Sequence, residues 1–166
     1  ETTVTWTATD SSGNIYTATQ KVTVQDTTKP TIATPSDITQ EATSESNNVV
    51  KLGDAKADDA VDVASIENDA PESFPLGETT VTWTATDDAG NTSTATQKIT
   101  LVDTTAPSIT IPEDITTDAI SLTTPVSVGT ATATDLTDDS PKITNDAPKS
   151  FPLGDTKVTW TVEDKF

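Results

Sequence analysis

The chain has 166 residues and a formal net charge of −18, and all nine of its basic residues are lysine. A chain this acidic and without arginine is not expected to bind nucleic acid or an anionic membrane surface. It also lacks histidine and cysteine, which excludes zinc sites, iron–sulfur sites and catalytic triads that depend on His or Cys. No apolar run approaches the roughly 20 residues of a bilayer-spanning helix, so no membrane insertion is expected from this segment.

One stretch occurs three times, at residues 1–10, 78–87 and, slightly altered, 155–164. Its tryptophans stand at positions 6, 83 and 160, so both intervals are 77 residues. Apolar residues alternate with threonine in each copy, which is the period of a half-buried β-strand. An apolar content of 32% would favour disorder on its own. The alternation instead predicts tandem β domains, and it places each tryptophan in a core rather than on a ligand platform.

Residues 1–25 predict a β-hairpin, with strands at 3–9 and 15–24, that forms the C-terminal end of a preceding repeat. A proline-containing linker follows at residues 26–30 and recurs at residues 103–107. Such a short linker, poor in glycine and serine, is expected to hold adjacent domains in a restricted relation.

Residues 26–102 form the complete repeat, in which Phe74 and Leu76 are expected to close one end of the core. Short strands separated by Pro, Gly, Asn and Asp predict an all-β chain of β-sandwich domains. The predicted strands of this repeat are 31–34, 37–42, 48–52, 54–58, 62–68, 78–86 and 92–102.

Residues 103–166 repeat the same plan but stop before a counterpart of the last strand. The alignment needs a one-residue deletion before Gly129 and a one-residue insertion before Ile143, both in predicted loops. The simpler interpretation is a window from a longer array. The sharper one is head-to-tail strand exchange, in which residues 13–25 of one copy complete residues 103–166 of another. The expected core residues of this repeat are Ile109, Ile115, Val126, Val128, Ile143, Phe151, Leu153 and Trp160.

The string from Phe74 to Asn91, FPLGETTVTWTATDDAGN, followed by the linker DTTAPSIT, resembles the hyalin repeat (HYR) module. The resemblance implies tandem domains like those of immunoglobulins and fibronectin type III, found on extracellular and cell-surface proteins and associated with adhesion. Animal members usually carry a disulfide-bonded Cys where Trp83 and Trp160 stand. This chain lacks those cysteines, as many prokaryotic versions do. Its composition resembles that of surface-layer or fibre proteins of archaea and marine bacteria.

Carboxylate and amide oxygens gather in two equivalent inter-strand loops, in the turn after the Trp strand and at the start of each linker. Calcium takes six to eight oxygen ligands, so these groups are candidates for Ca²⁺. The alternative is that they only stabilise turns, as Asp and Asn side chains often do. The candidate ligands are Asp58, Asp59, Asp62, Asp135, Asp138, Asp139, Asp87, Asp88, Asn91, Asp26 and Asp103.

Two other chemistries have weaker support in the sequence. A glycosidase pair of carboxylates is disfavoured, because the acidic loops have no aromatic platform or His beside them. Asn91-Thr92-Ser93 is a glycosylation sequon in a predicted turn, although chance occurrence explains it as well.

Together these patterns predict a non-enzymatic extracellular or cell-surface module. It would act as a semi-rigid acidic spacer in a fibre, an adhesin or a surface layer, in contact with neighbouring repeats and other copies of itself. The alternative is an accessory module of a secreted polysaccharide-degrading enzyme.

Overall fold

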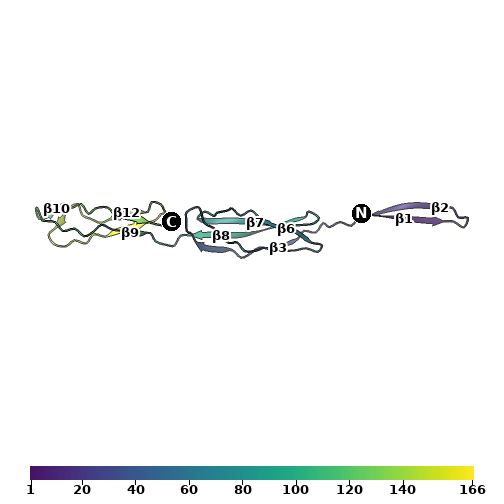
Figure 1. The fold of residues 1–166 in the computed structure, drawn as a ribbon, viewed down its shortest axis with the longest axis horizontal. Helices are drawn as coiled ribbons and strands as arrows, with labels where there is room; N and C mark the ends of the chain where they lie inside the picture. Colours follow the sequence, from purple (N-terminus) through teal and green to yellow (C-terminus); the bar gives the residue numbers. More distant parts are fainter. The chain divides into compact units, whose positions relative to one another are not determined.

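The computed structural model describes all 166 residues and contains strands but no helix (Figure 1). The prediction of an all-β chain is therefore confirmed, and no helix could span a bilayer. The strands are β1 (Thr2–Thr9), β2 (Ile15–Val22), β3 (Thr31–Ala33), β4 (Ile38–Glu41), β5 (Lys56–Asp58), β6 (Val63–Asn68), β7 (Gly77–Asp87), β8 (Thr92–Val102), β9 (Ser108–Thr110), β10 (Thr123–Thr124), β11 (Thr132–Thr134), β12 (Lys142–Asn145), β13 (Phe151–Pro152) and β14 (Trp160–Glu163).

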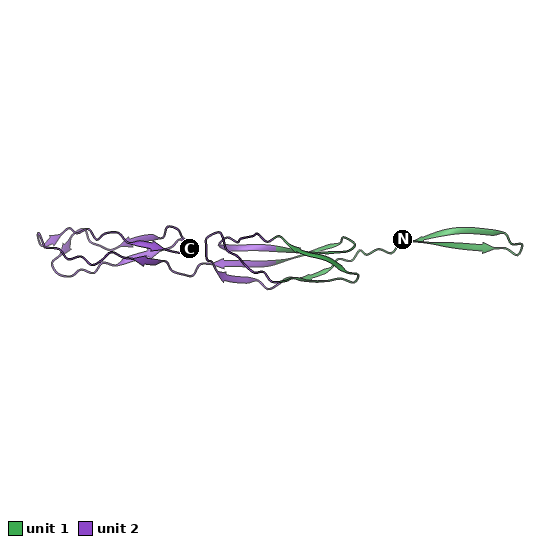
Figure 2. Ribbon diagram, in the orientation of Figure 1, with its two compact units in different colours: residues 1–34, 54–69, 82–96 green, residues 35–53, 70–81, 97–166 purple.

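The residues group into two compact units, shown in green and purple in Figure 2. The first unit holds the β1–β2 hairpin, the β3–β5 pair and β6. The second holds β4 and all the strands from β9 onward, and β7 and β8 contribute to both units. The first unit comprises Glu1–Thr34, Asp54–Asp69 and Thr82–Thr96, and the second Pro35–Gly53, Ala70–Val81 and Gln97–Phe166.

The largest sheet has the strand order β4-β8-β7-β6, in which β4 runs parallel to β8 and β6 antiparallel to β7. The two central strands are the Trp strand β7 and the strand that follows it, each 11 residues long. Central strands bury one row of side chains against the rest of the repeat, so their strict alternation becomes an alternation of burial. In β7 the residues at 81, 83 and 85 are buried, and in β8 those at 97, 99 and 101.

The core of the molecule lies in residues 26–102. Trp83 is only 6% exposed to solvent, and Phe74, from the loop before the Trp strand, is only 2% exposed. The expected core positions of Trp83 and Phe74 are therefore confirmed, whereas Leu76 is only half-buried. The buried apolar side chains are Ala42, Phe74, Val81, Trp83, Ala85, Ile99 and Leu101.

The predicted strand at residues 48–52 is wrong, because only Asn48 pairs there, in an isolated bridge with Phe74. The buried Asn48 side chain explains the difference. Its Oδ1 accepts from the N–H groups of Thr43 (2.7 Å) and Ser44 (3.1 Å), and its Nδ2 donates to the C=O groups of Ser44 (2.7 Å) and Phe74 (2.9 Å). A side chain that forms hydrogen bonds with neighbouring backbone groups favours a turn over the backbone pairing of a β-strand.

The hairpin β1–β2 is present, but its tryptophan is exposed, contrary to the expectation of a core position. Trp6 keeps 63% of its area exposed, and its indole N–H donates to Oε1 of Gln20 at 3.1 Å. The reason is that β1 and β2 form a two-stranded sheet with no second sheet packed on either face, and every residue of both strands is exposed. Residues 15–22 pair with β1 from Thr2↔Val22 to Thr9↔Ile15, and the other edge of β2 is unpaired, so the prediction of strand exchange by residues 13–25 stays a prediction.

Residues 103–166 form three two-stranded sheets, β9–β11, β10–β13 and β12–β14. Two of the expected core residues are exposed, Ile115 at 51% and Leu153 at 69%, and Trp160 is half-buried. β14 pairs only with β12, and a groove of about 820 Å³ lies beside Trp160.

Candidate cation-binding site

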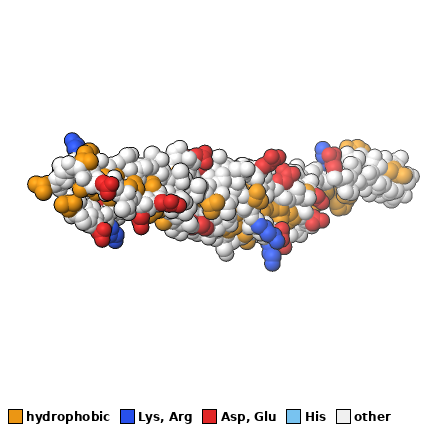
Figure 3. Space-filling view, turned by 60° about the vertical axis from the view of Figure 1, so that its left-hand side comes forward, with side chains coloured by type: hydrophobic (Ala, Val, Ile, Leu, Met, Phe, Trp, Pro, Cys, Tyr) orange, Lys and Arg blue, Asp and Glu red, His pale blue; other side chains and the backbone are white.

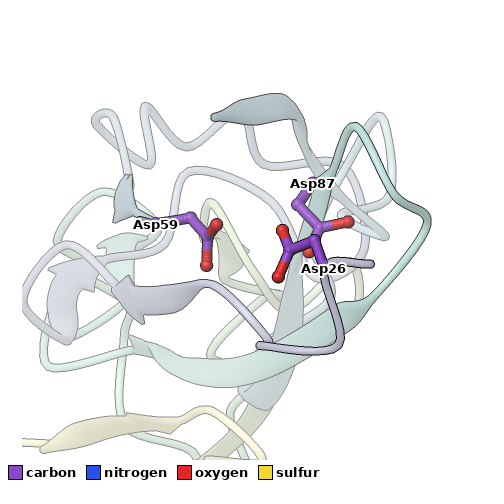
Figure 4. Close-up of side chains that lie close together, drawn as sticks. All are labelled: Asp26, Asp59 and Asp87. Atoms are coloured by element: carbon purple, nitrogen blue, oxygen red, sulfur yellow. The ribbon is translucent and has the colours of Figure 1, made fainter. Parts of the chain in front are cut away.

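Three aspartates from separate segments converge in residues 26–102 (Figure 4). Asp26 begins the linker, Asp59 lies in the loop between β5 and β6, and Asp87 is the last residue of β7. One carboxylate oxygen from each lies within 4.8 Å of the others. We call this group the first triad.

Asp87 is held rigidly because it opens the tight turn between the two central strands. Its Oδ1 accepts from the Asn91 N–H and its Oδ2 from the Asn91 Nδ2, both at 2.8 Å. Only 2% of Asp87 is exposed. Burial alone would raise the pKa of this carboxyl, but the hydrogen bonds from Asn91 and from the N–H groups of Ala89 and Gly90 outweigh it and lower the pKa. The carboxylate is therefore ionised at neutral pH.

Asp59 and Asp26 are each oriented by a local turn. Oδ1 of Asp59 accepts from the Val61 N–H, and Oδ1 of Asp26 accepts from the Thr28 N–H, both at 3.0 Å. These are side-chain turns of the kind that Asp commonly forms. The other oxygen of Asp26, Oδ2, is buried and has no hydrogen-bond partner. A buried carboxylate oxygen without a partner is costly, so the site favours a cation or another donor at this point.

An equivalent group, the second triad, occurs in residues 103–166. It consists of Asp103, Asp135 and Asp164, again with one oxygen of each within 4.8 Å of the others. Asp103 and Asp164 follow Asp26 and Asp87 by 77 residues, and Asp135 follows Asp59 by 76 because of the deletion before Gly129. The same convergence therefore arises in both copies of the repeat.

The two triads differ at one oxygen. In the second, the buried Thr137 hydroxyl donates its one proton to Oδ2 of Asp103, the nearer of two carboxylate oxygens within reach; the other is Oδ1 of Asp135 at 2.9 Å. The residue aligned with Thr137 in the first copy is Val61, which has no hydroxyl and is 67% exposed. The oxygen of Asp26 that corresponds to the satisfied oxygen of Asp103 is thus the one left without a partner.

The charges around the triads are not compensated by lysine. The ion pairs of the structure join Lys21–Glu1, Lys98–Glu78, Lys142–Glu163 and Lys165–Glu45, and none includes a triad residue. Figure 3 shows acidic side chains spread over the visible face with few basic ones among them. Calcium binds oxygens at about 2.4 Å, so any two ligands of one ion lie at most about 4.8 Å apart. The oxygens of both triads lie within that limit.

Each triad takes one aspartate from a linker, one from an inter-strand loop and one from the end of the Trp strand. The sequence pattern predicted these segments as separate candidate sites and did not predict that they converge. Oδ1 of Asp62 accepts from the Val63 N–H (2.8 Å), and Oδ1 of Asp138 accepts from the Ser140 N–H (3.0 Å). Asp58, Asp88 and Asp139 are exposed. The signal for the combination was the 77-residue spacing of Asp87 and Asp164, and Asp164 was not among the predicted ligands. Thr137 was also missed, because nothing in the sequence distinguishes it from the many surface threonines.

Asn91 supports the site rather than contributing an oxygen to it. The nitrogen that would carry a glycan, Nδ2, donates to Oδ2 of the buried Asp87. A glycan at Asn91 therefore requires this hydrogen bond to be replaced.

The chain is similar to known proteins along its whole length. A family model described as the HYR domain matches residues 25–101. Hyalin of the sea urchin Strongylocentrotus purpuratus is 36% identical over 179 aligned positions, which cover 99% of this chain and 15% of that protein. Hyalin of Lytechinus variegatus is 37% identical over 179 positions, covering 99% of this chain and 34% of that protein. The chain thus spans 15% and 34% of the lengths of these two relatives, and no solved structure matches it.

Proposed function

From the premise that residues 25–101 are a HYR domain and that the chain is homologous to sea urchin hyalin, we propose a non-enzymatic structural role outside the cell. The observation that carries the proposal is homology over 99% of the chain to two proteins named hyalin. In this role the tandem immunoglobulin-like repeats act as an acidic spacer in a fibre, an adhesin or a surface layer. The net charge of −18 keeps such a spacer soluble and attracts cations.

The cation in this proposal is calcium, bound by the two triads. Three features support it: the convergence of three carboxylates, the repetition of that convergence in the second copy, and the buried oxygen of Asp26 that lacks a partner. Asp26 and Asp103 belong to the linkers, whereas their partners belong to the body of each repeat. An ion at each triad would therefore fasten the start of a linker to the repeat that follows it.

The first triad is the stronger of the two sites in this proposal. Thr137 already satisfies an oxygen of Asp103 without any ion, whereas the corresponding oxygen of Asp26 gains a partner only when the ion binds. At the first triad, calcium binding also removes the free-energy cost of leaving the buried Asp26 oxygen without a partner. Calcium should therefore fill this site at the lower concentration.

Thermal unfolding of the whole chain in EDTA and in calcium tests the proposal. Calcium at about 100 times its dissociation constant should stabilise the folded state by about 2.7 kcal/mol. For a domain of this size such a gain raises the midpoint by roughly 10 °C or more. Unfolding can be followed through the fluorescence of the buried Trp83, with magnesium and sodium at matched ionic strength to separate binding from screening.

The matched variants are Asp26→Asn, within the first triad, and Asp88→Asn, an exposed neighbour of Asp87 outside it. Asp26→Asn should remove most of the calcium effect and Asp88→Asn should leave it intact. Equal midpoints in EDTA and calcium, or equal losses in both variants, would contradict a specific calcium site. The structural role has its own test in the flanking sequence, where further copies of the 77-residue repeat are expected rather than a catalytic domain.

A further inference from the structure

The linker after the first repeat leaves the sheet beside the end of β4. β4 pairs in parallel with β8 at the register Glu41↔Val102, and the Ala42 N–H donates to the Val102 C=O at 2.8 Å. Paired strands lie about 4.8 Å apart, so Glu41 stands next to the point where the chain leaves β8. Its side chain can therefore reach the first linker residues.

The Glu41 carboxylate accepts three hydrogen bonds from two consecutive linker residues. The Thr104 N–H donates to Oε1 at 2.7 Å, and the Thr105 hydroxyl donates to the same oxygen at 2.9 Å. The Thr104 hydroxyl donates to Oε2 at 2.8 Å. Both oxygens are therefore engaged, and hydrogen bonds to a charged acceptor are stronger than neutral ones. The same bonds lower the pKa of Glu41, the Thr104 N–H most of all.

We propose that Glu41 is a latch that fixes Thr104 and Thr105 against the end of β4. The joint after β8 is then a continuation of the sheet rather than a free hinge. Binding two successive residues restricts the backbone rotations between them, which a single contact would leave open.

The chain contains an unlatched copy of the same joint. The first linker repeats the sequence Asp-Thr-Thr at residues 26–28, and β1–β2 before it is a two-stranded sheet in which β2 pairs with β1 alone. Here the Thr28 N–H donates to Oδ1 of Asp26, as the Thr105 N–H does to Asp103, and no glutamate receives the threonine hydroxyls. The two linkers thus differ in the latch and share the local turn.

The latch deepens the proposed spacer role and rests on it, since a rigid joint matters most in a spacer. Its bonds involve no cation, however, so the latch and the calcium sites can fail separately. The test is therefore made in EDTA, where calcium has no influence.

Backbone ¹⁵N relaxation of the whole chain tests the latch directly. Rigid backbone has an order parameter near about 0.85, and flexible backbone falls below about 0.6. The amides of Thr104 and Thr105 should resemble those of β8, while Thr27 and Thr28 should lie in the flexible range. Glu41→Ala should move Thr104 and Thr105 into that range as well.

Glu72→Ala is the matched control, since it removes an exposed carboxylate of the same repeat that makes none of these contacts. It should leave the order parameters of both linkers unchanged. If Glu41→Ala disturbs the β4–β8 pairing itself, Glu41→Gln is the variant that tests the latch. It keeps one carbonyl acceptor for the Thr104 N–H, so Thr104 and Thr105 should show order parameters between those of the unmodified protein and those of flexible backbone. Order parameters at Thr104 and Thr105 that do not change in either Glu41 variant would overturn the proposal.

Discussion

Residues 26–102 and residues 103–166 contain nearly the same Trp strand and pack it differently. In the first, β7 lies between β6 and β8, and Trp83 is 6% exposed. In the second, β14 pairs with β12 alone, Trp160 is half-buried and no apolar side chain is fully buried. The comparison shows that the motif does not determine the burial of its own tryptophan. That burial depends on the rest of the repeat. The hairpin has its following strand, β2, and still leaves Trp6 63% exposed. In residues 26–102 the side chains at 97, 99 and 101 of β8 complete the core together with residues that precede β7.

The largest effect is expected from replacing the three equivalent tryptophans by alanine. Trp83→Ala should cost about 3–5 kcal/mol, since it opens a cavity in a closed core. Trp160→Ala should cost less, and Trp6→Ala should stay within about 0.5 kcal/mol, as for other exposed sites. Urea unfolding followed by amide NMR signals of each segment measures all three. Equal losses at the three positions would break the comparison.

The next largest effect concerns Asn48, whose position is taken by Thr124 in the second copy, since Asn48 pairs with Phe74 and Thr124 with the equivalent Phe151. Asn48→Ala should destabilise residues 26–102 by about 1–3 kcal/mol, because it leaves the buried C=O of Phe74 and the turn at Thr43 and Ser44 without their side-chain partner. The exposed neighbour serves as control, and Asn47→Ala should have no measurable effect on the same urea transition.

The difference between the triads can be sharpened with Val61→Thr, which introduces the hydroxyl that the second copy has in Thr137. A hydrogen bond to Asp26 should stabilise the calcium-free protein by about 1 kcal/mol and reduce the gain from calcium. The control is Val49→Thr, at a valine that is 82% exposed. If Val61→Thr and Val49→Thr behave alike in EDTA and in calcium, the unpartnered oxygen of Asp26 is not what sets the first triad apart.

The smallest effect concerns Asp10, the counterpart of Asp87 in the hairpin, which has no triad around it. The Asn14 side chain, followed by the Asn14 backbone N–H, lowers the pKa of Asp10 below its usual value of about 3.9. Because the folded pKa is the lower one, this stabilisation is present above the unfolded pKa and is lost as pH falls through the folded pKa.

A carboxyl ¹³C titration should therefore place the Asp10 midpoint below that of an unstructured aspartate. Asn14→Ala should raise the midpoint, and the distant Asn47→Ala should leave it in place. A midpoint that Asn14→Ala does not move would show that this turn does not hold the carboxylate.

The sequence could predict the strands wherever alternation and turn residues agreed, as in β7, β8 and the hairpin. It failed at residues 48–52, because the hydrogen bonds of one buried side chain, Asn48, replaced a strand there. The exposure of Trp6 could not be read from its own strand, since it depends on which other strands are present. The triads were predicted as three separate sets of acidic residues. Their convergence depends on contacts between Asp26, Asp59 and Asp87, which no local pattern encodes.

We propose that calcium fastens each linker to the repeat that follows it through the two triads. An amide NMR titration of the whole chain with calcium is the decisive measurement. Saturable shifts are expected at Asp26, Asp59 and Asp87 first, at Asp103, Asp135 and Asp164 at higher concentration, and none at Asp10. Small unsaturable shifts spread over all acidic residues, Asp10 included, would contradict it.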